Sequence, residues 1–341
     1  MLRVFEQLPE GLLSADVGAL HALLGGPSLI HLQGRRDPPL FVTTLLHGNE
    51  TGGFLALQQL LRAYRDRELP RSLSLFIGNV AAAREGVRLL DGQPDYNRVW
   101  PGGEVSTETP EAAMMARVVE EMAGRDVFAS IDLHNNSGIN PHYGCINRID
   151  HRFLHLAALF SRTVVYFTRP RGVQSMAMAP ICPAVTVECG QTGDARGVDH
   201  AREFVEAALH LAQIPDHPLP ARDVDVFHTV VTVKVPRDLC FGFGPARADL
   251  RFAEDLDHLN FRELPEGTTL AWVGDSGRAR LEAWDDRGRD VAGRFFDRRE
   301  GEIRTTRPVM PSMFTLDERI IRQDCLGYLM ERYPLDLAHA D

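Results

Sequence analysis

The alternation of short apolar runs with longer segments of helical period, from about residue 28 to residue 213, most constrains the fold of this chain. Such alternation is typical of an α/β domain, in which helices flank a mixed, mostly parallel sheet. Several of the runs are continuously apolar, as strands buried on both faces are. The expected strands are Ser28–Gln33, Leu40–Leu46, Leu73–Val80, Val127–Leu133, Thr163–Phe167 and Ala184–Glu188. The expected helices are Thr51–Tyr64, Glu111–Met122 and Asp199–Leu211.

The pattern changes after Gln213, where the proline-rich segment Ile214–Pro220 predicts a hinge. Short alternating stretches follow, such as Val226–Val235 and Thr269–Val273, and they are separated by Gly and Asp turns. We therefore expect two domains, an α/β domain over residues 1–213 and a smaller β-rich domain over residues 214–341. Within the second, Trp284–Glu300 mixes both signs of charge and predicts a solvated hairpin or loop.

Composition narrows the functional classes. A chain of 341 residues with 44% hydrophobic side chains can bury a core that needs no metal, so a metal site here would be functional. The net charge of −10 disfavours nucleic acid as a partner. The five cysteines include no CxxC pair, which favours a reducing compartment. No signal peptide and no apolar run long enough for a membrane span is recognisable, so we expect a cytoplasmic protein that does not bind membranes. The oligomeric state is left open.

The segment His47-Gly48-Asn49-Glu50 lies where an apolar strand ends and a helix is expected to begin. The i, i+3 spacing of His47 and Glu50 can direct an imidazole and a carboxylate at one ion, and an open catalytic zinc site has three such ligands plus water. A solvent-facing turn histidine is the alternative interpretation of this segment considered alone.

A second apolar strand ends in Ser130-Ile131-Asp132-Leu133-His134, again at the carboxyl-terminal edge of the expected sheet, where ligands of open α/β sheets gather. His134 can complete a triad with His47 and Glu50, and Asp132 can orient a histidine ligand. The alternative for Asp132 is a strand-capping acid.

Glu188 ends the buried-type strand Val185-Thr186-Val187-Glu188. Beside zinc-bound water, a buried carboxyl there can take a proton and pass it to a leaving amine. A structural salt bridge is the alternative.

Arginines concentrate in the segment between residues 79 and 102, which contains Arg84, Arg88 and the pair Asn97-Arg98. A guanidinium can bind a carboxylate through two hydrogen bonds, and a fixed cation can stabilise an oxyanion. Any one of these arginines can equally be a surface charge.

Together these motifs resemble the succinylglutamate desuccinylase/aspartoacylase family, a branch of the zinc carboxypeptidase-like fold. The resemblance lies in His47-Gly48-Asn49-Glu50, in Gly78-Asn79 with Arg88 and Asp95-Tyr96-Asn97-Arg98, in Asp132-Leu133-His134-Asn135, and in Val187-Glu188-Cys189-Gly190. It spans residues 40–200 and, more loosely, a C-terminal β domain. The order of the motifs matches throughout.

The resemblance implies a zinc-dependent hydrolase that cleaves the amide, or an ester, of a small carboxylated N-acyl compound such as an N-acyl amino acid. It implies one Zn²⁺ per chain, held by His47, Glu50 and His134. Glu188 would act as general base on zinc-bound water and then as general acid, and Arg88 would polarise the carbonyl. Asn97 and Arg98 would bind a carboxylate of the substrate.

The chain departs from the family pattern at Tyr96, where a leucine is usual, and at Cys189-Gly190-Gln191 after the catalytic glutamate. A further substrate-binding residue is not identifiable, although Arg171, Tyr328 and Tyr333 are candidates. Two alternatives remain open at this stage. One is a metallocarboxypeptidase acting on peptide C-termini, and the other is a zinc-dependent binding protein without catalysis.

Overall fold

The structure is a computed structural model that describes residues 1–104, 108–245, 247–274, 277 and 279–335. Contacts divide the chain into two compact units. The first comprises Met1–Asn135, His142–Val226 and the last described residue, Leu335; the second comprises Asn136–Pro141 and Phe227–Pro334. The described helices include none that is long and apolar enough to cross a membrane.

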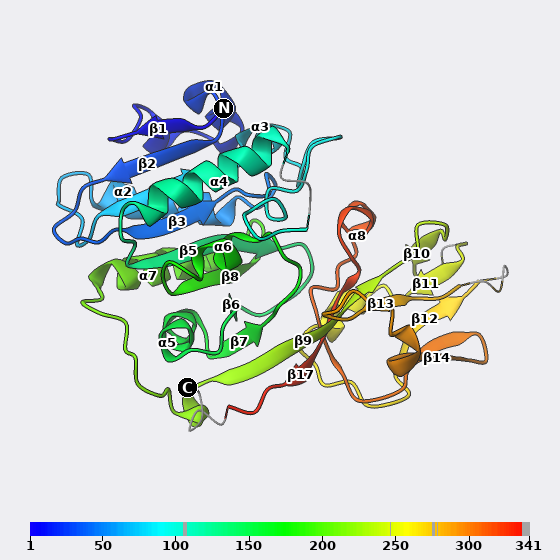
Figure 1. Ribbon diagram of the computed structural model, residues 1–341. Helices are drawn as coiled ribbons and strands as arrows, with labels where there is room; N and C mark the ends of the chain where they lie inside the picture. Colours follow the sequence, from blue (N-terminus) through cyan, green and yellow to red (C-terminus); the bar gives the residue numbers. More distant parts are fainter. Residues whose placement is uncertain (105–107, 246, 275–276, 278, 336–341) are drawn as a thin grey trace. The chain divides into compact units, whose positions relative to one another are not determined.

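The first unit is a sheet with helices on both faces (Figure 1). Its strands are β1 (Arg3–Phe5), β2 (Ser28–Leu32), β3 (Leu40–Thr44), β4 (Leu73–Ile77), β5 (Ala129–Asn136), β6 (Tyr143–Ile146), β7 (Thr163–Tyr166) and β8 (Ala184–Gln191). Its helices are α1 (Leu20–Leu24), α2 (Gly52–Ala63), α3 (Val80–Arg84), α4 (Pro110–Ala123), α5 (His151–Phe160), α6 (Gln174–Met178) and α7 (Ala195–His210).

Within this unit the strands lie in the order β1-β2-β4-β3-β5-β8-β6-β7. The pairs β1/β2, β3/β4, β3/β5 and β6/β7 are parallel, whereas β2/β4 and β6/β8 are antiparallel. The expected fold class, a mixed and mostly parallel sheet flanked by helices with a smaller second sheet, is therefore confirmed.

Helices α2 and α4 cover opposite faces of the sheet (Figure 1). The chain steps from β3 to β4 through α2 and back across β3 to β5 through α4, so right-handed crossovers require opposite faces. Helix α4 begins where the sequence predicts, because the Thr109 side chain accepts a hydrogen bond from the backbone N–H of Ala112 and Pro110 occupies the first turn. Helix α2 buries Phe54, Leu57, Leu60 and Leu61.

All six predicted strands and all three predicted helices are present, with ends shifted by a few residues. Strands β1 and β6 and helices α1, α3, α5 and α6 were not predicted. Strand β6 has only four residues and contains Gly144, which packs against Ala157 of α5, so it lacks a clear β pattern. Strand β5 runs past His134 to Asn136, with every residue buried.

The second unit is rich in short strands. They are β9 (Asp225–Lys234), which starts at the end of the first unit, β10 (Phe241–Phe243), β11 (Leu250–Phe252), β12 (Thr269–Val273), β13 (Glu282–Trp284), β14 (Phe296–Arg299), β15 (Glu302–Thr305), β16 (Met310–Ser312) and β17 (Gly327–Arg332). Its helix is α8 (Glu318–Gln323). Strands β10-β11-β12-β15-β14 form one sheet, while β9 pairs with β13 and β17.

The core of the second unit contains Leu250, Phe252, Ala271, Phe314 and Leu329, each fully buried. The segment Trp284–Glu300, expected to be a hairpin or loop, begins as a turn in which Asp285 binds the guanidinium of Arg289 through two hydrogen bonds. It then forms β14, so the expectation holds only for its first part.

The short segment Asn136–Pro141 belongs to the second unit although it begins with the last residue of β5. The side-chain amide of Asn260 donates to the carbonyls of Ile139 and Phe314, and Gly138 lies so close to the Phe314 carbonyl that a Cβ would be 1.9 Å from its oxygen. Glycine is therefore required at position 138.

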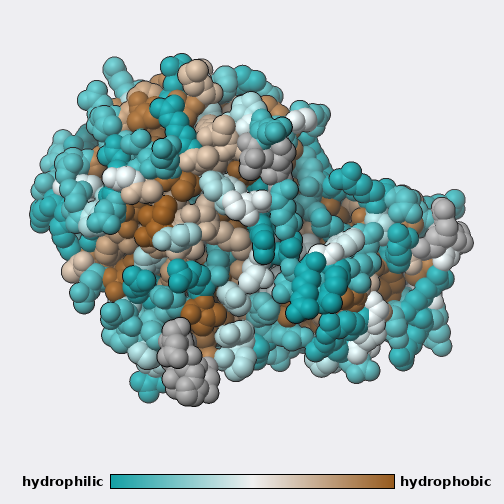
Figure 2. Space-filling model, viewed as in Figure 1, coloured by the Kyte–Doolittle hydropathy of each residue, from teal (hydrophilic) through white to brown (hydrophobic). Residues whose placement is uncertain are grey.

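Figure 2 shows a face of the chain that is mostly hydrophilic, with hydrophobic side chains in small separate groups. Scattered apolar residues are normal on a protein surface.

Candidate functional site

The turn after β3 is shaped by a close backbone approach. Leu45 has a left-handed backbone (φ 55°), and Gly48 donates its N–H to the Arg88 carbonyl at 3.0 Å. A Cβ on Gly48 would lie 2.2 Å from the backbone nitrogen of Ala83, so only glycine fits. This turn directs His47 and Glu50 inward, where they are 4% and 7% exposed.

The two histidines meet at the Glu50 carboxylate. Nδ1 of His47 lies 2.7 Å from Oε1 of Glu50, and Nδ1 of His134, at the end of β5, lies 2.7 Å from Oε2. The backbone N–H of Asn135 also donates to Oε2 at 3.2 Å. The three predicted metal ligands are therefore brought together from the turn between β3 and α2 and from β5.

The outer nitrogen of each imidazole faces an aspartate. Nε2 of His134 lies 2.8 Å from Oδ2 of Asp132, and Nε2 of His47 lies 3.0 Å from Oδ1 of Asp95. Thr43 donates its hydroxyl to the other oxygen of Asp132. When an aspartate accepts the proton of Nε2, the lone pair of Nδ1 is free to bind a metal ion between the two imidazoles.

The sequence analysis predicted the orienting role for Asp132 and overlooked Asp95. The only available signal for Asp95 was its place in the Asp95-Tyr96-Asn97-Arg98 motif, because it is 48 residues from His47.

In the cluster, neighbouring charges shift the pKa values of Glu50 and His134 more than burial does. Burial favours the neutral acid at Glu50, but the imidazoles of His47 and His134 hold its pKa far below the usual value. Burial likewise disfavours a charged His134, yet Asp132 and Glu50 hold its pKa well above the usual value. The carboxylate of Glu50 and the two imidazoles therefore attract one another strongly.

Glu188 lies on β8, opposite Tyr143 of β6, and is 6% exposed. Burial raises its pKa to about 7, the carboxylates of Glu50 and Asp132 add to the rise, and His134 opposes it. The charges of His134, Glu50 and His47 act on Glu188, so it lies within electrostatic range of the three clustered residues. A carboxyl with a pKa near 7 can both accept and release a proton at neutral pH.

The neighbouring thiol is inert. Burial, with the charge of Glu188 and Glu50, raises the pKa of Cys189 well above its ordinary value, so the thiol is neutral at pH 7.

Arg88 is buried beside the cluster. Its Nη2 donates to Oδ2 of Asp95 at 2.9 Å, and its Nη1 lies 3.5 Å from Oε1 of Glu50. Arg84 is different, because it is exposed and pairs with Glu85. Of the three arginines predicted as candidates between residues 79 and 102, Arg88 contacts the cluster directly. Arg98 is close enough to Asp95 to lower its pKa.

Asn97 and Arg98 extend the site. Nδ2 of Asn97 lies 3.2 Å from Nε2 of His134, and its Oδ1 accepts the backbone N–H of Gln174 at 3.0 Å. Arg98 is half-buried and donates to the Asn97 carbonyl at 2.8 Å. Gln174 is a site residue that sequence reasoning missed, since no motif contains it.

Arg171, Tyr328 and Tyr333 were the further candidates for substrate binding. Arg171 is exposed in the turn before α6, Tyr328 belongs to β17 and Tyr333 follows it in the second unit. Their proposed contact with a substrate stays a prediction.

The residues present fit a divalent metal. One ligand atom each from His47, Glu50 and His134 lies within 4.8 Å of the others, and all three side chains are buried. Two imidazoles and one carboxylate are the donor set of an open catalytic zinc site, and the aspartates behind the imidazoles complete it. Among the described residues this is the one such group of His, Cys, Asp and Glu.

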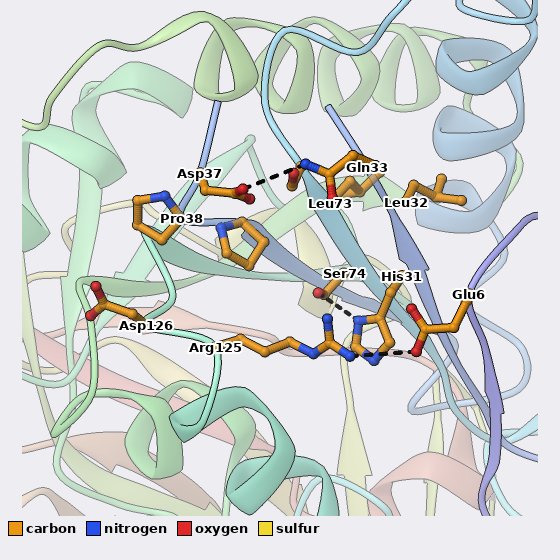
Figure 3. Close-up of a pocket in the computed structure, with 12 residues that line it drawn as sticks. Glu6, His31, Leu32, Gln33, Asp37, Pro38, Leu73, Ser74, Arg125 and Asp126 are labelled. Atoms are coloured by element: carbon orange, nitrogen blue, oxygen red, sulfur yellow. Dashed lines mark hydrogen bonds and ion pairs between the residues drawn. The ribbon is translucent and has the colours of Figure 1, made fainter. Parts of the chain in front are cut away.

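A cavity of about 670 Å³ lies at the amino-terminal ends of β3 and β4, the opposite edge from the cluster (Figure 3). His31, bonded to the hydroxyl of Ser74 at 2.9 Å, and Arg125, 3.5 Å from Glu6, lie within it. None of the predicted site residues lines it.

Residues 37–213 match the model of the succinylglutamate desuccinylase/aspartoacylase catalytic domain. The chain belongs to this family. The matched region contains every site residue named in the predictions, from His47 to Glu188. No curated protein sequence matches the chain significantly.

Several solved structures have a fold similar to that of this chain. Succinylglutamate desuccinylase from Chromobacterium violaceum is 18% identical, with a TM-score of 0.57 over 88% of this chain and 87% of that one. Murine aminoacylase 3 is 16% identical, with a TM-score of 0.57 over 87% and 97%. A product-bound ectoine utilization protein from Ruegeria pomeroyi is 16% identical, with a TM-score of 0.53 over 90% and 84%. The fold of this chain is thus that of the desuccinylase/aspartoacylase structures.

Proposed function

We propose that this protein is a zinc-dependent hydrolase that cleaves the amide bond of a small carboxylated N-acyl compound, such as an N-acyl amino acid. The observation that carries the proposal is the buried cluster of His47, Glu50 and His134 beside Glu188, a carboxyl whose pKa is about 7. The names of the similar structures, a desuccinylase and an aminoacylase, favour this substrate class over peptides.

One Zn²⁺ per chain would be held by His47, Glu50 and His134. When bound, zinc supplies a Lewis acid that activates water and polarises a carbonyl oxygen. Asp132 and Asp95 hold the two imidazoles in the orientation that this requires.

Glu188 is the proton-transfer residue in this proposal. It accepts a proton from the water molecule as the water oxygen bonds to the carbonyl carbon. It then gives that proton to the amine nitrogen as the C–N bond breaks. The same group serves both steps because a pKa near 7 makes neither protonation state costly at neutral pH.

Arg88 stabilises the negative charge that develops on the carbonyl oxygen. Its guanidinium is buried, and its contact with Asp95 fixes it before the substrate arrives, so little reorganisation is needed during the reaction. Asn97 and Arg98 bind a carboxylate of the substrate. Nε2 of His134 donates its proton to Asp132, so both N–H groups of the Asn97 amide remain available to a substrate oxygen.

The test is metal content, measured by mass spectrometry on the wild type and on His47→Ala and His134→Ala, with folding checked by circular dichroism. We expect about one zinc per wild-type chain and none in either variant. N-acyl amino acids and short peptides are then assayed side by side, with Glu188→Gln as control.

Preferential cleavage of peptides would replace the proposal with a metallocarboxypeptidase. Tight zinc binding without hydrolysis of any acylated compound would indicate a binding protein. A wild type that takes up no zinc on reconstitution would contradict the metal site itself.

A further inference from the structure

A series of polar contacts among four buried residues begins and ends on β5. Ser130 Oγ accepts a hydrogen bond from Nε2 of Gln174 at 2.7 Å, and the backbone N–H of Gln174 donates to Oδ1 of Asn97 at 3.0 Å. Nδ2 of Asn97 lies 3.2 Å from Nε2 of His134. Ser130 and His134 are four residues apart on one strand and therefore point to the same face. All four side chains are at least nine-tenths buried.

Gln174 connects Ser130 to Asn97 in this series of contacts. It is the first residue of α6, so its backbone N–H has no partner within the helix and is available to Asn97. Its side chain anchors that end of the short helix to β5 through Ser130. The direction of the N–H towards Asn97 therefore depends on the Gln174 side chain.

The orientation of the Asn97 amide follows from this contact. A side-chain amide can turn over and exchange its oxygen and nitrogen, and the Gln174 N–H prevents this because it requires an acceptor. With Oδ1 fixed on Gln174, Nδ2 must face the metal cluster. An amide turned over would present an oxygen, which repels a carboxylate.

The fold retains Gln174 although its amide is not fully paired. Among the residues that the structure describes, none donates to Oε1 of Gln174, and the side chain is fully buried. A buried acceptor without a donor is destabilising, so an apolar side chain of the same size would suit this position better for stability alone.

We propose that Gln174 is a positioning residue for substrate binding, which holds the Asn97 amide with its nitrogen directed at the substrate carboxylate. This inference rests on the proposed function, in which Asn97 binds that carboxylate. It assigns no contact between Gln174 and the substrate.

The experiment compares Gln174→Met and Ser130→Ala, which break the anchor from its two ends, with Ser175→Ala as matched control. Ser175 is the next residue of α6, and its hydroxyl accepts from Thr186 at 3.0 Å without touching Asn97. In the zinc-loaded protein we expect Gln174→Met to raise KM for an N-acetyl amino acid about fivefold, with kcat within about twofold. Ser130→Ala should have a similar effect, and the double variant no more than either single one.

A second readout does not depend on activity. The side-chain amide NMR signals of Asn97, assigned by their absence in Asn97→Ala, should shift or broaden in Gln174→Met and Ser130→Ala and stay in place in Ser175→Ala. The melting temperature of Gln174→Met should remain within a few degrees of the wild type, because the variant also removes the unpaired oxygen.

If KM and the Asn97 amide signals change equally in all three variants, Gln174 has only a packing role and the proposal is overturned. It is also overturned if both KM and the amide signals are unchanged in Gln174→Met. If Gln174→Met does not fold, Ser130→Ala decides the outcome. If the wild type hydrolyses no N-acyl compound, the proposed function fails, whereas the amide signals still test the positioning of Asn97.

Discussion

Nδ1 of His134 lies 2.7 Å from Oε2 of Glu50, although 84 residues separate the two along the chain. The contact exists because β3 and β5 are parallel neighbours, so the turn after one strand meets the end of the other. Both side chains are buried, and each is backed by further hydrogen bonds. The four predictions below test how this arrangement works.

Asp132→Asn should weaken zinc binding about 10- to 100-fold, because the amide no longer provides a carboxylate that fixes the proton of His134 on Nε2. Competition with a chromogenic chelator measures the affinity. Asp285→Asn is the control. Asp285 is also buried but belongs to the second unit, and this variant should bind zinc as the wild type does. Equal affinity in Asp132→Asn and wild type would show that this aspartate does not orient His134.

Glu188→Gln should make the metal-free protein more stable relative to the wild type as pH rises. The folded state holds the Glu188 proton up to about pH 7, whereas the unfolded chain releases it near the ordinary glutamate pKa of 4.5. The folded wild type therefore binds more protons between these values, and its unfolding free energy falls as pH rises through them.

Above pH 7 the wild type has lost roughly 3 kcal/mol of unfolding free energy through this effect. The glutamine variant has no titrating group at this position and does not lose it. Urea unfolding of both metal-free proteins at pH 5 and pH 8 measures the difference. A gap between variant and wild type that does not widen with pH would contradict the raised pKa.

Gly48→Ala should destabilise the fold by about 1–3 kcal/mol and reduce zinc content, since the new Cβ would lie 2.2 Å from the backbone nitrogen of Ala83, which cannot easily move. Thermal unfolding and metal analysis measure both effects. Gly18→Ala is the matched control, because a Cβ there meets nothing within 4 Å. If both variants melt together with the wild type, the close approach at Gly48 is not a constraint.

Arg88→Lys should lower kcat about 10²- to 10³-fold, because a lysine cannot keep the two-pronged contact with Asp95 and Glu50 that fixes the cation near the carbonyl oxygen. Steady-state kinetics on an N-acetyl amino acid measures it. Arg84→Lys alters an exposed arginine of the same segment and should retain full activity. A similar small effect in both variants would remove Arg88 from the reaction.

Much of the first unit was predictable from local pattern. Buried strands such as Leu40–Thr44 and Leu73–Ile77 are continuously apolar, and α4 carries its cap and proline in the sequence. The clustered residues His47, Glu50 and His134, together with Glu188, were visible because each lies near the carboxyl end of an apolar strand or in the turn after it. Short elements such as β6 and α6 were missed, since four or five residues contain too little periodicity.

The sequence by itself determined which side chains lie at the ends of the buried strands, because hydrophobic runs specify strands and parallel strands present their carboxyl ends at one edge. Only the tertiary structure decided which of them touch. The contacts of Asp95 with His47 and of Gln174 with Asn97 join segments 48 and 77 residues apart, and nothing in either segment alone indicates its partner. Such contacts depend on how loops pack over the sheet, where hydrogen-bond geometry rather than periodicity selects the neighbour.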